Sequence, residues 1–166
     1  MASSANIIVG PANISVDGVD VGYTQGGVSF KKALDYLDVE ADQSKGVMRK
    51  EVTMERAHIT TTLLESTLAN MRTVFQEAAS QAWSGSALAF GMANPVAIEH
   101  TLTITGKGPA VAGVSKTRTY TFYRAIKVDE VDHMIGARDA ASILPVTFEL
   151  LKDENYGSRF GFVYEV

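Results

Sequence analysis

Histidine and acidic residues are the side chains of this chain best suited to acid–base or metal chemistry, but their spacing does not match a known site. The three histidines, His58, His100 and His133, lie far apart in the sequence and in no metal-ligand spacing. We expect His58 and His100, each inside a predicted strand, to have structural or surface roles. The segment Asp129–His133 is the best acid–base cluster, and we interpret it as a solvated acidic turn.

Two short motifs are also incomplete. Ser84-Gly85-Ser86 lacks the flanking residues of a nucleophile elbow. Gly106-Lys107-Gly108 is too short for a phosphate-binding loop and precedes a loop instead of a helix. The chain has 0 cysteines, which excludes disulfides and cysteine-ligated metals. The sequence therefore predicts no enzyme, no cofactor and no metal site.

Composition and charge narrow the class of protein further. The chain has 166 residues, 46% hydrophobic and 20% charged, which suits one globular domain with a full core. The net charge of -4 argues against a protein that binds nucleic acid by neutralising phosphates. The first residues do not form a signal peptide, and no apolar stretch approaches the ~20 residues of a membrane span. We expect folding in a cytoplasm and no membrane insertion.

Alternating apolar and polar residues predict a mainly β protein. The Asp17-Gly18 turn predicts a hairpin, because both residue types tolerate the positive φ angles that a two-residue turn needs. Its strands are Ile14–Val16 and Val19–Tyr23. Further strands are predicted at Gly26–Ala41, Ala57–Leu64, Ala97–Thr105, Thr117–Val128, Ser142–Leu151 and Phe160–Val166. Gly106–Lys116 is predicted to be the tip of a long hairpin.

One helix is predicted, with Ser66 as its N-cap. Its apolar stripe consists of Leu68, Met71, Phe75, Ala78 and Ala82. Glu77 falls outside that stripe and is expected to face water. The helix should end between Ser80 and Gly85 and cover one side of the sheet.

The segment Ala41–Glu55 (ADQSKGVMRKEVTME) is predicted to be a long, protruding, charged loop. Long loops in compact domains usually carry function or contacts, and we expect this one to contact other copies of the same protein. Its charged residues are Asp42, Lys45, Arg49, Lys50, Glu51 and Glu55. Residues 1–12 are predicted to be a loose N-terminal arm.

Two polar patterns on the predicted strands have more than one interpretation. Glu99, Thr101 and Thr103 share a face that is either an ordinary solvent-facing surface or the smooth lining of a channel. Arg118 and Arg124 share the apolar face of Thr117–Val128 in a strictly alternating strand. These arginines either pair with carboxylates across a subunit contact or lie at the strand end with their heads in water.

The order of these features is similar to that of a known family. The run NISVDGVDVGYTQGGVSF, the charged loop around Lys45-Gly46 and the run AHITTTLLESTLANM resemble the tail tube proteins (major tail proteins) of long-tailed bacteriophages. In that family a hairpin and a glycine pair precede a strand, a protruding loop and a strand that leads into a helix. Leu64–Leu68 resembles the segment that connects this strand to the helix in that family. The resemblance is strongest over Asn13–Met71, and nothing matches the additional C-terminal immunoglobulin-like domain of some members.

The resemblance implies a β-sandwich or barrel with one flanking helix, forming a single tail-tube domain over residues 1–166. It implies hexameric rings that stack into the hollow tube through which phage DNA enters the host. Tape-measure and tail terminator proteins would be partners, and the protein would be a structural part of the virion, assembled in the host cytoplasm. The predicted loop at residues 41–55 would then bridge rings. A secretion-system tube protein of the same fold and a monomeric β-sandwich binding module are the alternatives.

Overall fold

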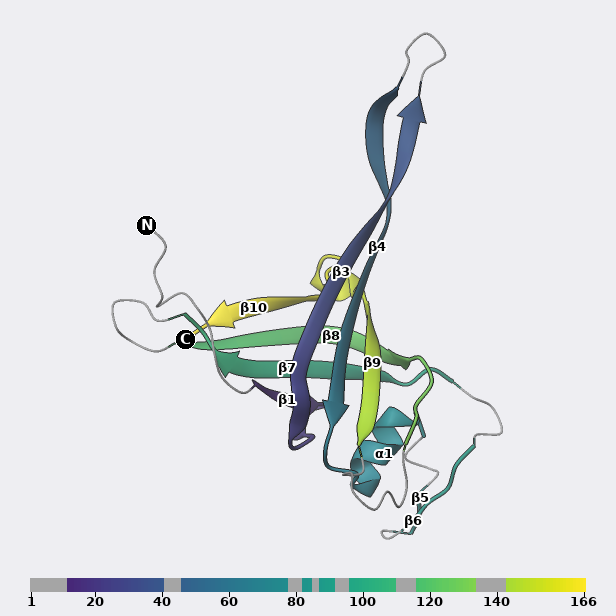
Figure 1. The fold of residues 1–166 in the computed structure, drawn as a ribbon, viewed down its shortest axis with the longest axis vertical. Coiled ribbons are helices and arrows are strands. Elements are labelled where there is room, and N and C mark those ends of the chain that lie inside the picture. Colours follow the sequence, from purple (N-terminus) through teal and green to yellow (C-terminus); the bar gives the residue numbers. More distant parts are fainter. Residues whose placement is uncertain are drawn as a thin grey trace.

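The fold is mainly β and antiparallel, as predicted. The computed structural model describes residues 12–40, 46–77, 82–84, 87–91, 96–109, 116–133 and 143–166. One sheet contains eight strands in the order β2-β1-β7-β8-β9-β4-β3, with β10 also paired to β8 (Figure 1). These strands are β1 (Ala12–Val16), β2 (Val19–Asp20), β3 (Thr24–Glu40), β4 (Val47–Leu63), β7 (Glu99–Lys107), β8 (Thr117–Val128), β9 (Leu144–Leu151) and β10 (Gly161–Glu165). A separate two-stranded sheet pairs β5 (Ala82–Ser84) with β6 (Ala87–Leu88).

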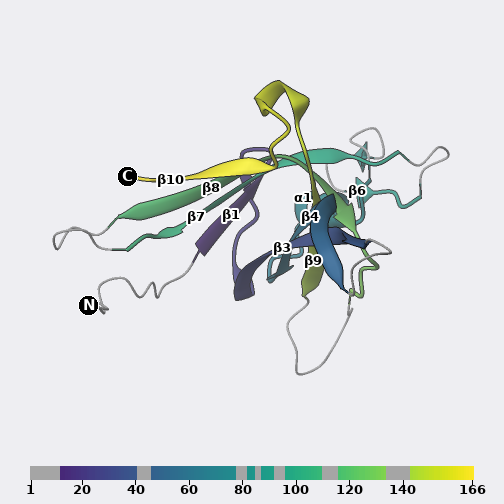
Figure 2. The ribbon, with the colours of Figure 1, turned by 90° about the horizontal axis from the view of Figure 1, so that it is seen from above.

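The strands β9 and β10 pair with the same edge of β8, opposite β7, and this divides the sheet into two branches. The first half of β8 pairs with β10, and the stretch from Arg124 to Val128 pairs with β9. Beyond this point β9, β4 and β3 cross β7, β8 and β10 at a steep angle (Figures 1 and 2). The end strands β2 and β3 do not pair with each other, so the sheet is not closed into a barrel. The expected sandwich or barrel is thus, within one chain, a single bent sheet with free edges.

The core fills the angle between the two branches. Ile59 of β4 lies directly opposite Phe148 of β9, and both are buried. Across the core, the ring of Phe30 from β3 packs on Phe122 of β8 with their centroids 5.3 Å apart. The buried apolar residues of the core are Ile14, Val16, Val21, Ala57, Ile59, Leu63, Val74, Leu102, Ile104, Phe122, Ala125, Leu144, Val146, Phe148 and Leu150.

A β-bulge in β8 overturns the strictly alternating face predicted for this strand. Phe122 and Ala125 both face the core. They lie opposite Leu102 and His100 of β7, so β8 has one extra residue in this stretch. The extra residue changes which side chains share a face. Arg124 therefore lies on the face opposite Phe122, whereas the sequence pattern put the two on one face.

A long hairpin replaces most of the predicted loop. β3 and β4 contain 17 residues each, and their outer halves extend away from the rest of the sheet (Figure 1). Residues 47–55 are strand, so the prediction of a loop over 41–55 is wrong there, and residues 41–45 lie outside the described residues. The high charge of this segment is compatible with a strand because opposite charges pair across it, as between Lys50 and Asp38 at 2.7 Å. The predicted loose arm at residues 1–12 includes Ala12, which begins β1; the rest lies outside the described residues.

The predicted helix is shorter than expected. α1 spans Leu68–Val74, and its N-cap is Thr67, whose Oγ1 accepts a hydrogen bond from the Asn70 amide at 3.2 Å. The predicted cap, Ser66, is one residue too early. Gln76 has a left-handed backbone with φ of 56°, which ends the helix well before the predicted Ser80–Gly85. The side-chain Nε2 of Gln76 donates a hydrogen bond to the carbonyl of Lys127 at 3.1 Å.

The early end of the helix also changes the position of Glu77. This side chain is buried instead of facing water, and its Oε1 accepts a hydrogen bond from the Gly91 amide at 2.8 Å. A residue beyond the last helical turn no longer follows the helical period. The prediction for Glu77 was therefore wrong because it extended that period too far.

The glycine-containing turns agree with the sequence. Asp17 and Gly18 have φ angles of 52° and 79°, as the predicted two-residue turn between β1 and β2 requires. Gly26 and Gly27, with φ of 77° and 79°, form a bulge near the start of β3 without ending the strand.

The packing of β10 on β8 predicts a strict requirement for glycine at position 161. A Cβ at Gly161 would lie 2.0 Å from the Thr121 carbonyl oxygen and 2.8 Å from the Phe122 Cα. Because both atoms belong to the backbone, Gly161→Ala must shift β10, at a cost of about 1–3 kcal/mol in the free energy of unfolding. Urea denaturation measures this loss. Val163→Ala on the same strand is the control, and an equal loss in both variants would contradict the close-contact explanation.

Candidate functional site

The side chains best suited to chemistry do not converge. His58 is half-buried on β4, His100 is buried on β7, and the His133 ring lies 6.3 Å from the Phe75 ring. No group of three potential metal-ligating side chains occurs within the described residues. Over the same residues, no helix is long and apolar enough to cross a membrane.

His100 has a structural role. Its Nδ1 lies 2.7 Å from Oδ2 of Asp17, whose other carboxylate oxygen accepts a hydrogen bond from the Thr101 amide at 2.8 Å. The His100 ring packs edge-on against Phe148 in the core. These contacts attach the turn between β1 and β2 to β7, as expected for a structural histidine.

The two incomplete motifs do not form sites in the described part of the chain. Ser84 ends β5, and Gly85 and Ser86 lie outside the described residues. Gly106 and Lys107 end β7, and the Gly108 amide bonds the Lys116 carbonyl at 2.7 Å. This segment begins a hairpin connection and not a helix, so it lacks the helix N-terminus of a phosphate-binding loop.

The charged residues predicted to contact other copies lie on the protruding hairpin. We call the outer part of this hairpin, Leu34–Glu40 with Val47–Met54, the arm. Arg49, Lys50 and Glu51 belong to it, and Glu55 lies at its base, whereas Asp42 and Lys45 are outside the described residues. Arg49 pairs with Glu51 at 3.0 Å on its own strand.

The arm exposes large apolar side chains on both faces, which the prediction of a charged loop missed. They are Leu34, Tyr36, Leu37, Val39, Val47, Met48, Val52 and Met54. In a strand, neighbouring residues point to opposite faces, so Tyr36 and Leu37 lie on different sides of the arm. The apolar residues within this charged segment were the signal in the sequence that favoured a strand over a solvated loop.

Glu55 connects the base of the arm to the rest of the sheet. Its carboxylate pairs with Lys152 at 2.6 Å and with Lys32. Hydrogen bonds from these two lysines lower the pKa of Glu55. The Lys152 ammonium also lies 5.5 Å from the centre of the Phe160 ring, within the range of a cation–π contact.

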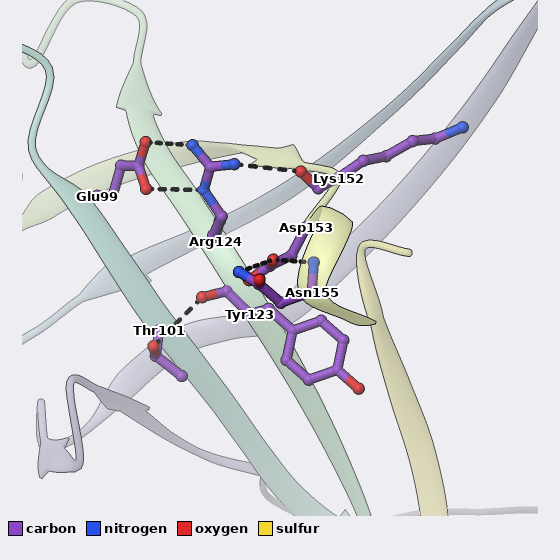
Figure 3. Close-up of polar contacts among 7 residues, drawn as sticks. All are labelled: Glu99, Thr101, Tyr123, Arg124, Lys152, Asp153 and Asn155. Atoms are coloured by element: carbon purple, nitrogen blue, oxygen red, sulfur yellow. Dashed lines mark hydrogen bonds and ion pairs between the residues drawn. The ribbon is translucent and has the colours of Figure 1, made fainter. Parts of the chain in front are cut away.

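Arg124 pairs with a carboxylate of its own chain. Its Nε and Nη2 donate to the two oxygens of Glu99 at 2.8 and 2.6 Å, and its Nη1 donates to the Lys152 carbonyl at 3.3 Å (Figure 3). These bonds join β7, β8 and the residue after β9. The Arg124 guanidinium lowers the pKa of Glu99.

Arg118 also pairs within the chain. Its Nε donates to Glu165 of β10 at 2.6 Å, and this hydrogen bond raises the pKa of Arg118. In the single chain both arginines thus pair with a carboxylate instead of leaving their heads in water, and pairing across subunits stays a prediction.

Uncharged polar residues cover the face of the sheet opposite the core, where Thr101 and Thr103 lie. Cross-strand pairing aligns them in two rows over four strands: Ser15, Thr103, Thr121 and Phe162, and Asn13, Thr105, Thr119 and Tyr164. Neither row contains a charged side chain. Glu99, at one end of this face, pairs with Arg124, and Lys107 follows Thr105 by two residues at the other end of β7.

An aromatic cluster adjoins this polar face. The Tyr123 ring stacks on Tyr156 with centroids 3.9 Å apart, and Phe162 lies 5.8 Å from Tyr123. Tyr156 belongs to the short 3-10 helix Glu154–Tyr156, in which the Asp153 carboxylate accepts from the amide of Asn155 at 2.9 Å (Figure 3). The Thr101 hydroxyl donates to the Tyr123 carbonyl at 3.3 Å.

Comparison with known proteins assigns no family. Neither the models of protein families nor the curated protein sequences match this chain.

The Glu99–Arg124 pair predicts a measurable coupling within one chain. Both side chains are partly exposed, so we expect a small favourable coupling from a double-mutant cycle with Glu99→Gln and Arg124→Gln. Urea denaturation of the unassembled chain measures it. A coupling of zero for the unassembled chain, with a clear coupling in an oligomer, would instead restore the intersubunit interpretation.

The lowered pKa of Glu55 predicts a pH-dependent contribution to stability. Because the folded pKa lies below the ordinary value of 4.5, the ion pairs stabilise the fold above that value, and their effect disappears as the pH falls through the folded pKa. We expect the melting temperatures of wild type and Glu55→Gln to differ most above about pH 5.5 and to converge near about pH 3. Thermal unfolding followed by circular dichroism between these values measures the difference.

Glu51→Gln is the matched control for Glu55→Gln, because Glu51 pairs with Arg49 on a highly exposed part of the arm. Exposed pairs contribute little to stability, so this variant should unfold almost as the wild type does at every pH. If the melting temperatures of wild type and Glu55→Gln differ by the same amount down to about pH 3, the pairing of Glu55 with the two lysines is not the cause.

Proposed function

We propose that this chain is a structural subunit of a hollow tube, of the tail tube type of long-tailed bacteriophages. The observation that carries the proposal is the arm, which holds large apolar side chains in water on both of its faces. Exposed apolar surface of this kind marks protein–protein contact sites. Several kinds of assembly could cover such an arm. The resemblance over Asn13–Met71 favours the tail tube among them.

Free strand edges favour assembly into rings. β3 is the last strand of the main sheet, and the end strand on the other side, β2, has only two residues. Unpaired edges favour association with another chain, and contacts between two different surfaces generate closed rings or helical stacks. Hexameric rings, stacked with the arm tips between them, are the arrangement that the resemblance implies.

The uncharged polar face suits a conduit for DNA. We infer that the face carrying Thr101, Thr103 and the two rows lines the lumen. Lysine or arginine side chains there would bind phosphates through counterion release and retain the DNA. Neutral side chains form no such ion pairs, so DNA passes without specific binding. Glu99 belongs to this lining as half of a neutral pair.

The proposed role is structural and needs no catalysis and no cofactor. The subunit would be part of the virion after assembly in the host cytoplasm. Its other partners would be the tape-measure and tail terminator proteins. A secretion-system tube of the same fold is the alternative with the same arm and ring contacts.

One observation favours the monomeric binding module as a second candidate. The exposed rings of Tyr156, Phe162 and Tyr164 lie next to polar side chains, as in surfaces that stack on sugars. However, the Tyr123 and Tyr156 rings stack on each other at 3.9 Å, and each loses one face to its neighbour. The binding module also leaves the apolar arm without a role, so we favour the tube.

Removal of the arm tests the proposed function. Leu34 and Glu55 lie directly opposite each other, so replacing residues 35–54 with an Asn-Gly turn removes the arm beyond its base and leaves every buried core residue in place. We expect the wild type to form hollow tubes or rings in negative-stain electron microscopy, and the shortened chain to stay folded and monomeric.

Circular dichroism and the melting temperature of the shortened chain show whether it is folded. If the shortened chain forms normal tubes, the arm is not needed for assembly. A wild type that remains monomeric at all concentrations and binds a glycan would favour the binding module.

A further inference from the structure

An apolar groove lies where β3 faces β8 and β10, immediately below the arm. Two cavities of about 360 and 250 Å³ form it, and both are lined by Phe30, Tyr120 and Phe122. The first cavity extends along β10 to Phe160 and Val163. The groove is open because the sheet is not closed into a barrel, so β10 and β3 leave a gap between them.

One face of the arm suits this groove. Tyr36 and Val52 are directly opposite each other across the arm, and their side chains are 53% and 56% exposed. Tyrosine is enriched among the residues that dominate protein–protein interfaces, so Tyr36 suits an apolar pocket, and Val52 adds apolar surface beside it. The described residues of the free chain do not cover either side chain.

The arm of a chain does not reach its own groove. Phe30 and Lys32 line the groove, and the same strand continues outward from them into the arm, which extends away from the sheet (Figure 1). A straight hairpin cannot fold back onto the strand from which it emerges. The occupant of the groove must therefore come from another molecule.

We propose that the arm of one copy docks in the groove of the adjacent copy in the same ring, with Tyr36 and Val52 as its anchors. The arm and the groove are different surfaces, so the contact is head-to-tail and each subunit contributes one of each. The charged tip of the arm then extends beyond the groove. This inference rests on the proposed function, because it names the surface that receives the arm within the assembly.

Charge supports the same pairing. The arm carries four acidic side chains, Asp35, Asp38, Glu40 and Glu51, and two basic ones, Arg49 and Lys50. The groove is lined by Lys32, Lys107, Arg118 and Arg159 and by one acidic residue, Glu55. Arg118 also pairs with Glu165 beside the groove, and an excess of positive charge remains. A net negative arm and a net positive groove attract each other and disfavour contacts between two arms or two grooves.

Mixing two single variants tests the proposal. Tyr36→Asp damages the arm, and Val163→Asp damages the groove; both positions are 53% exposed, so the folded monomer should tolerate the changes. Each variant alone should associate about 30-fold more weakly than the wild type, or worse, as expected for the loss of a hot-spot residue. Circular dichroism checks that each variant is folded.

An equal mixture of the two variants should form dimers but no rings. In such a dimer, the intact arm of Val163→Asp occupies the intact groove of Tyr36→Asp, and the remaining arm and groove are both damaged. Sedimentation velocity and native mass spectrometry detect this one-to-one species. Leu37→Asp is the matched control, because Leu37 is 55% exposed on the opposite face of the arm and should leave ring formation intact.

The outcomes separate this inference from the proposed function. If dimers form in the mixture but not in either variant by itself, the arm docks in the groove. If the wild type forms rings or tubes but the mixture forms no dimers, or if the Val163→Asp variant assembles normally, the groove is not the docking site and the tube proposal stands. If Leu37→Asp prevents ring formation and Tyr36→Asp does not, the anchor face is wrong. A wild type that never assembles overturns both proposals.

Discussion

The division of one edge of β8 between β9 and β10 is the constraint on which the rest of the structure depends. Two strands cannot pair with the same residues, so each takes half of β8 and the sheet divides there. The bulge at Arg124 increases the local twist at this point. The branch containing β9, β4 and β3 then folds over the core, which brings Phe30 onto Phe122 and leaves a gap beside β10.

The same geometry explains why the arm cannot be stable alone. Only the inner half of the long β3–β4 hairpin lies over the core, where Ala57 and Ile59 are buried. The outer half has no sheet behind it, and a two-stranded ribbon is only marginally stable in water. Cross-strand ion pairs such as Lys50–Asp38 hold its register, and Glu55 with its two lysines fixes its base. Its apolar residues contribute stability only when another surface covers them.

The sequence predicted most strands of the main sheet, because alternating residues and a turn or break mark them, but it missed the outer half of β4. Asp17-Gly18 and the glycine-rich segment after Lys107 are such turns. The errors have physical causes that act beyond the local pattern. The bulge that turns Arg124 away from Phe122 depends on pairing with β7, which no single strand reveals. The arm resembled a loop because charge is common in loops, although charges also pair across exposed strands.

The sequence showed which strands carry polar residues, but it did not show which of these side chains pair with each other. Glu99 and Arg124 were assigned to separate roles because 25 residues separate them, whereas strand pairing places them in one bidentate ion pair. This pair matters for the proposed lumen. A lone Glu99 would repel DNA and a lone Arg124 would bind it, but the pair gives the polar face almost no field of either sign. The two uncharged rows and the neutral Glu99–Arg124 pair can therefore line a DNA conduit, because neutral side chains bind no phosphate by counterion release.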